Sequence, residues 1–141
     1  MQNRQTNRVS KKKILVVDDD EMHLYTTKEL LQDEHYEVIT HKSKYGIGVT
    51  NLVRELQPDL ILLDVNMPGL SGDKLAKLLR WRNAPFLFYS SNDEDSLREM
   101  ASQYGAKGYI CKGDLAELKN VVKKHLDPAA YSSEGMLKIV L

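Results

Sequence analysis

Five short apolar runs recur along the chain, each too short for a helix. Most of them do not alternate apolar with polar residues, which is typical of strands buried on both faces of a parallel sheet. They predict five strands, over residues 14–17, 36–40, 60–63, 86–89 and 108–111.

Helical patterns fill the intervals between these runs. Val49, Leu52, Val53 and Leu56 recur at the spacing of one helix face, and a similar pattern spans residues 97–104. The strand starts lie 22 to 26 residues apart, which is the length of one strand plus one helix. The chain therefore predicts five βα units. The second helix is the weakest, because Gly46 and Gly48 precede its apolar face, and we expect it to start late or fray.

Parallel strands need right-handed crossovers, which place helices on both faces of the sheet. The predicted fold class is α/β, a doubly wound five-stranded parallel sheet. Its site should lie outside the carboxyl ends of the strands. We expect residues 1–12 to be a disordered segment and residues 13–127 to be the only folded domain. Residues 128–141 form a tail or linker, whose apolar end could pack on the domain or meet a partner.

Composition excludes several classes of protein. Lys and Arg number 20, as do Asp and Glu, so no general positive field favours nucleic acid. No apolar stretch approaches the roughly 20 residues of a membrane span, and no secretory signal begins the chain. The single cysteine, Cys111, excludes an internal disulfide and is expected to be a core residue. We predict a cytoplasmic protein without direct contact to nucleic acid or membrane.

Charged and hydroxyl side chains stand at the carboxyl ends of four predicted strands. The first strand ends in Asp18, Asp19 and Asp20; Asp64, Ser90 and Lys112 end the third, fourth and fifth. Clustered carboxylates repel one another, and Mg²⁺ binds through carboxylates, water and phosphate oxygens, so a magnesium ion is expected here.

Phosphoryl transfer fits this set of residues. Asp64 can act as a nucleophile toward a phosphoryl group, while Lys112 and the Ser90 hydroxyl stabilise it. Backbone N–H groups of the turn at Pro68 and Gly69 could add donors.

The segments VVDD, LLDVNMPGLSG, PFLFYSS and GYICK, in this order and spacing, resemble the receiver domains of two-component response regulators, the CheY-like family. The resemblance covers roughly residues 12–127. It implies a flavodoxin-like (βα)5 fold with strand order 2-1-3-4-5. It also implies a phosphorelay switch that takes a phosphoryl group from a histidine kinase or phosphotransfer protein and acts on a downstream protein target or an output domain.

The resemblance also implies roles for single residues. Asp64 is the phosphoacceptor and also a ligand of Mg²⁺, which is further held by Asp19 directly, by Asp18 largely through water, and by the backbone carbonyl of Asn66. Ser90 moves toward the phosphoryl group and Lys112 bridges to it. Tyr109 is the aromatic switch, which turns inward and changes the surface of the fourth helix, fifth strand and fifth helix.

Three features depart from the family pattern. Gly113 stands where a proline, often after a cis bond, usually follows the lysine. Ser90 and Ser91 replace the commoner threonine and alanine or glycine. Asn66 and Asn92 occupy the positions that tune attack by water, and because neither is ionised we expect a phosphate of middling lifetime.

Other polar residues have simpler interpretations. Asp20 is expected to cap a helix. The four histidines lack metal-ligand spacing and are expected to be structural or solvated; they are His23, His35, His41 and His125.

Two alternatives to a phosphorylated switch remain. One is a degenerate receiver that binds partners without phosphorylation. The other is a phosphohydrolase of the haloacid-dehalogenase kind, which is disfavoured because its nucleophile precedes its acidic pair and its acid/base aspartate would stand where Asn66 is. We expect the chain to catalyse only its own phosphorylation and dephosphorylation.

Overall fold

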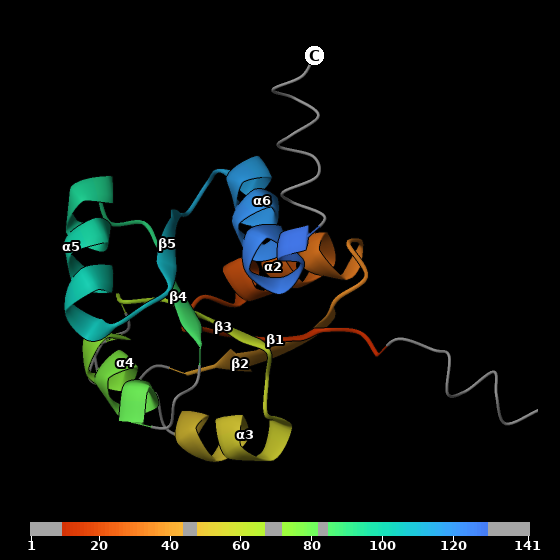
Figure 1. Ribbon diagram of the computed structural model, residues 1–141, viewed down its shortest axis with the longest axis horizontal. Coiled ribbons are helices and arrows are strands. Elements are labelled where there is room, and N and C mark those ends of the chain that lie inside the picture. The colour runs from red at the N-terminus through yellow and green to blue at the C-terminus, as the bar shows by residue number, and fades with distance from the viewer. Residues whose placement is uncertain (1–9, 44–47, 67–71, 82–84, 130–141) are drawn as a thin grey trace, which may run out of the picture.

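Five strands alternate with five helices in the computed structural model, which describes residues 10–43, 48–66, 72–81 and 85–129 (Figure 1). The predicted strands lie within two residues of those observed. The strands are β1 (Lys13–Asp18), β2 (Glu37–Lys42), β3 (Leu60–Leu63), β4 (Phe86–Ser90) and β5 (Gly108–Cys111). The helices are α2 (Glu21–Gln32), α3 (Val49–Leu56), α4 (Gly72–Trp81), α5 (Glu94–Tyr104) and α6 (Leu115–Leu126).

All strand pairs are parallel, and the order across the sheet is β2-β1-β3-β4-β5. The predicted fold class and strand order are both confirmed. The central neighbours are β1 and β3, with Val17 opposite Leu63. The order changes direction at β1, so the crevice beyond the carboxyl ends of β1 and β3 is the expected position of a site.

Two apolar layers enclose the sheet, one on each face. Leu15 and Leu63 belong to the layer covered by α3, α4 and α5, whereas their neighbours Val16 and Leu62 belong to the layer covered by α2 and α6. Figure 1 shows α2 and α6 together on one side of the strands and α3 and α4 on the other. Burial of both faces explains why the central strands lack alternation.

Aspartates begin the helices that follow three of the strands. Asp20 caps α2 by accepting a hydrogen bond from the Met22 N–H at 2.9 Å, which confirms its predicted role. Asp93 and Asp114 cap α5 and α6 in the same manner. Such caps stabilise a helix by about 1 kcal/mol each and fix the angle at which the chain leaves the strand end.

The helix α3 begins late, as predicted. Its first residue is Val49, and the preceding Gly48 has φ +84°, a left-handed conformation that glycine adopts at little cost. Gly46 lies outside the described residues, as do the turn at Pro68 and Gly69 and most of the predicted segments 1–12 and 128–141. Within the described ranges no helix is long and apolar enough to cross a membrane.

Candidate functional site

The carboxylates of β1 and β3 meet at the carboxyl edge of the sheet. Asp18 ends β1 and Asp64 directly follows β3, and the Asp64 N–H donates to the Val17 carbonyl at 3.1 Å. Carboxylate oxygens of Asp18, Asp19 and Asp64 all lie within 4.8 Å of one another. Asp18 and Asp64 are only 2% and 4% exposed. The structure therefore brings together the three predicted acids, and Asp20 does not belong to this group.

Lys112, which follows β5, reaches into this acidic group. Its Nζ lies 2.6 Å from Asp18 Oδ2 and 3.2 Å from Asp64 Oδ2, and its side chain is 8% exposed. A buried ammonium between two buried carboxylates is a strong electrostatic arrangement, because water screens it little. The predicted convergence of Lys112 with the acids is present.

Burial and the contacts with Lys112 shift two pKa values of this group. Burial raises the pKa of the Asp18 carboxyl, and the opposing hydrogen bond from Lys112 does not cancel that effect. Burial alone would lower the pKa of Lys112, but its hydrogen bond to Asp18 and the negative charge of Asp64 raise it above its ordinary value. The ammonium stays charged, and one cation faces three carboxylates. Three hard oxygen donors with excess negative charge fit Mg²⁺.

Ser90 lies at the end of β4 and is fully buried. Its Oγ accepts a hydrogen bond from the Asn66 side-chain amide at 2.9 Å, and the same amide donates to Asn92 Oδ1 at 2.6 Å. The Asn66 backbone N–H donates to Asp64 Oδ1 at 3.0 Å. Asn66 thus connects the Asp64 carboxylate to the Ser90 hydroxyl. Metal binding by its backbone carbonyl stays a prediction.

Tyr109 lies on β5 beside α5, with its hydroxyl donating to Glu94 Oε1 at 3.1 Å. Its ring packs against the apolar layer that contains Phe88 and Leu97. The tyrosine therefore connects the strand that ends near Lys112 to the first turn of α5. Its role as a switch stays a prediction.

In the loop after β5, Gly113 follows Lys112 at the position where the family pattern has a proline. Every described peptide bond is trans, including Lys112–Gly113, and Gly113 has φ +105°. That left-handed conformation explains why glycine stands here. The Lys112 N–H donates to the Ser90 carbonyl at 2.8 Å, so the backbone joins the ends of β4 and β5 directly.

Two residues of the site were not expected from the sequence. His23 Nδ1 lies 3.3 Å from Lys112 Nζ, a contact that the sequence did not predict. The Tyr89 ring centroid lies 5.9 Å from the same Nζ. His23 stands three residues after the Asp20 cap, so it lies on the same face of α2 as Asp20, near the strand ends. That spacing is the feature of the sequence that could have predicted the contact.

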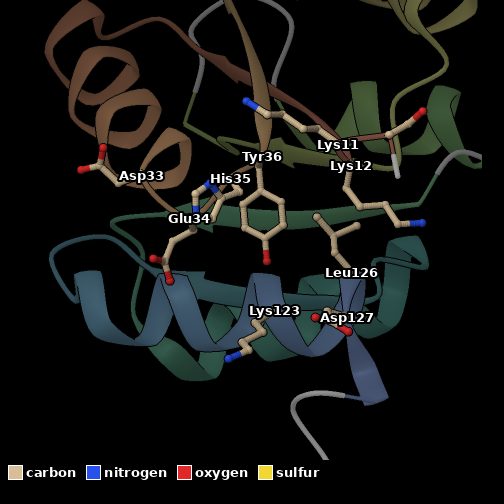
Figure 2. Close-up of a pocket in the computed structure, with 10 residues that line it drawn as sticks. Lys11, Lys12, Asp33, Glu34, His35, Tyr36, Lys123, Leu126 and Asp127 are labelled. Atoms are coloured by element: carbon tan, nitrogen blue, oxygen red, sulfur yellow. The ribbon is translucent and has the colours of Figure 1, made fainter. Parts of the chain in front are cut away.

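A separate cavity of about 490 Å³ lies at the opposite edge of the sheet (Figure 2). Figure 2 shows Tyr36, just before β2, pointing toward α6, with Leu126 beside it. Charged side chains of both signs line it: Lys12 and Lys123 are positive, and Asp127 is negative. None of the predicted site residues lines it, so it is not part of the acidic site.

Cys111 packs against the core as predicted. It is half-buried and contacts the same apolar layer as Tyr109. Burial, together with surrounding carboxylates such as Glu117, raises the pKa of its thiol, which disfavours the reactive thiolate.

Comparison with known proteins identifies similar chains. The family model described as "Response regulator receiver domain" matches residues 14–123. The chain is 36% identical to the positive alginate biosynthesis regulatory protein of Pseudomonas aeruginosa, over 89% of this chain and 51% of that protein. It therefore spans about half the length of that relative. It is 31% identical to the polar-differentiation response regulator DivK of Brucella anthropi, over 72% of this chain and 84% of that protein.

Solved structures agree with the sequence comparison. The chemotaxis protein CheY4 of Vibrio cholerae superposes with a TM-score of 0.75 at 25% identity, covering 83% of this chain and all of that one.

Proposed function

The chain belongs to the response regulator receiver domain family, and on that premise we propose that it is a phosphoacceptor switch whose Asp64 takes a phosphoryl group from a histidine kinase or phosphotransfer protein. The observation that carries this proposal is the group of three carboxylates within 4.8 Å, with the Lys112 ammonium inserted among them. The activity, the partner proteins and the output of the whole protein are part of the proposal.

The transfer exchanges one bond at phosphorus for another. An Asp64 carboxylate oxygen forms a bond to phosphorus while the P–N bond to the donor imidazole breaks, and the imidazole nitrogen keeps the electron pair. Lys112 and Ser90 supply a cation and a hydroxyl to the phosphoryl oxygens. Later attack by water on phosphorus releases orthophosphate and restores the Asp64 carboxylate. Each chain thus returns to its starting state without turning over an external substrate.

A magnesium ion would be held by Asp19, Asp64 and the Asn66 carbonyl, with Asp18 contributing largely through water. The donor set fits such an ion because it consists of hard oxygens with excess negative charge. When bound, Mg²⁺ neutralises the carboxylates and the phosphoryl oxygens, which otherwise repel one another.

Movement of Ser90 would convert phosphorylation into a signal. Its hydroxyl oxygen accepts from the Asn66 amide, and we expect it to exchange that partner for the phosphoryl group. The Lys112 N–H donates to the Ser90 carbonyl, so a shift of the Ser90 backbone would also move the end of β5. We expect Tyr109 to leave Glu94 and turn inward, which changes the surface of α5, β5 and α6 that partners contact.

Hydrolysis of the phosphoryl group is expected at a middling rate. Asn66 and Asn92 are hydrogen-bonded to each other at 2.6 Å, and neither side chain can act as a base toward water. The cytoplasmic location is a proposal from the sequence, based on the single cysteine and on the lack of a membrane-length apolar stretch and of a secretory signal pattern.

The experiment is mass spectrometry of the protein after incubation with acetyl phosphate and Mg²⁺. We expect one added phosphoryl group in the wild type and in Asp95→Asn, a control carboxylate on the surface of α5. We expect none in Asp64→Asn. An unmodified wild type would instead support the degenerate receiver. Repeated release of phosphate from small phosphate esters would support the phosphohydrolase.

A further inference from the structure

The Lys112 ammonium carries three protons and has three acceptors. Asp18 Oδ2 lies at 2.6 Å, Asp64 Oδ2 at 3.2 Å and His23 Nδ1 at 3.3 Å. The Tyr89 ring faces the same ammonium from 5.9 Å. Because the lysine side chain is 8% exposed, water has little access to replace a missing acceptor. The histidine is the only member of this set of acceptors that is not a carboxylate.

His23 Nδ1 has a second neighbour, the Asp20 carboxylate, whose Oδ2 lies 3.2 Å away. An imidazole nitrogen either accepts with its lone pair or donates a proton, so Nδ1 cannot bind Lys112 and Asp20 at once. With the proton on Nδ1, the ring donates to Asp20, and Nδ1 has no lone pair with which to accept from Lys112. With the proton on Nε2, Nδ1 accepts from Lys112.

Burial decides between these arrangements. Asp20 is 49% exposed and its Oδ1 already accepts from the Met22 N–H, so water can hydrate Oδ2. Lys112 is enclosed and would leave one N–H without an acceptor. A buried charged donor without a partner costs more than an exposed carboxylate that keeps its water.

We propose that His23 is a positioning residue for Lys112: its neutral ring, protonated at Nε2, accepts the third N–H of the ammonium through Nδ1. This bond turns the other two N–H groups toward Asp18 and Asp64, where the phosphoryl group arrives. The kinetic part rests on the proposed function. The hydrogen bond itself does not, so the two can fail separately.

The direct test is ¹⁵N NMR of histidine-labelled protein at about pH 8. We expect His23 Nδ1 to show the shift of an unprotonated ring nitrogen in the wild type. In Lys112→Met the donor is gone, and we expect the proton to move to Nδ1 and bind Asp20. The signals are assigned by their loss in His23→Asn. A protonated Nδ1 in the wild type would overturn the proposal.

The kinetic test compares two amide substitutions. An asparagine oxygen lies near the position of Nδ1, whereas a glutamine oxygen lies near that of Nε2. His23→Asn should therefore keep the bond to Lys112 and be phosphorylated by acetyl phosphate within twofold of the wild-type rate. His23→Gln should be slower by about three- to tenfold, because it loses a hydrogen bond from a charged donor.

The pair also controls for structural effects, because His23 is 44% exposed in the first turn of α2 and both variants should remain folded without urea, with His23→Gln unfolding at the lower urea concentration because it leaves one Lys112 N–H without its acceptor. Equal rates for the two variants would refute the positioning role. If the wild type itself took up no phosphate, the proposed function would fail, and the NMR measurement would still decide whether His23 binds Lys112.

Discussion

Replacing Lys112 by methionine tests the electrostatics of the site. The change keeps the length of the apolar stem and removes the ammonium, which leaves the carboxylates of Asp18 and Asp64 buried without a countercharge. Breaking a buried ion pair from one side costs about 3–5 kcal/mol. Because Asp18 can take up a proton, we expect the lower end, about 3 kcal/mol at pH 7.5 without metal. That is a large part of the roughly 5–15 kcal/mol that stabilises a domain.

The loss of stability in Lys112→Met should become smaller as the pH falls. Burial raises the pKa of Asp18 above 3.8, so the folded protein binds this proton more tightly than the unfolded chain does. The stability due to protonated Asp18 is fully present below 3.8 and is lost as the pH rises through the folded pKa. Without Lys112 that folded pKa is higher still. The difference in the free energy of unfolding between Lys112→Met and the wild type should therefore become smaller as the pH falls toward 3.8.

Urea denaturation followed by circular dichroism, with EDTA or with Mg²⁺, measures both effects. We expect Mg²⁺ to restore most of the stability of Lys112→Met, since either cation can neutralise the carboxylates. The control is Lys42→Met, whose exposed pair with Glu21 at 3.5 Å should contribute less than about 1 kcal/mol. A Lys112→Met variant within 1 kcal/mol of wild type in EDTA, at every pH, would refute this account of the site.

Two further predictions concern the backbone of one turn and the proposed signal. Gly105 follows α5 and has φ +79°, so Gly105→Ala should lower the free energy of unfolding by about 1–2 kcal/mol. Gly105→Asn should lower it less, because asparagine tolerates the left-handed conformation better. Equal losses of stability in thermal melts would contradict the backbone explanation. Ser90→Ala should accept phosphate but lose the phosphate-dependent change in amide hydrogen exchange of β5, whereas Ser91→Ala should keep it; a normal change in Ser90→Ala would separate Ser90 from the signal.

The sequence predicted the framework because burial and strand ends leave direct traces in it. The strands were visible as apolar runs because both faces of the sheet are covered. Asp18 and Asp64 could be placed together because each follows a run that ends at the same edge of a parallel sheet. Gly48 and Asp20 marked where α3 and α2 begin through backbone freedom and capping.

What the sequence did not predict depends on side-chain directions. His23 contacts Lys112 only because α2 leaves β1 at an angle that returns its first turn to the strand ends. The Asn66 amide contacts Ser90 and Asn92 because Asn66 lies three residues beyond β3, beside the end of the neighbouring strand β4. In the sequence Tyr89 does not differ from the other residues of its buried run, although its ring faces an ammonium. Neither periodicity nor composition carries these orientations.

The cavity of Figure 2 has a practical consequence for handling the protein. It is lined both by residues 10–12, just before β1, and by residues 126 and 127, at the end of α6, so these two segments lie at one pole of the domain. The carboxylates lie at the other end of the strands. A fluorescent label attached at residues 10–12 or at residues 126 and 127 would therefore lie away from the acidic edge and leave it accessible.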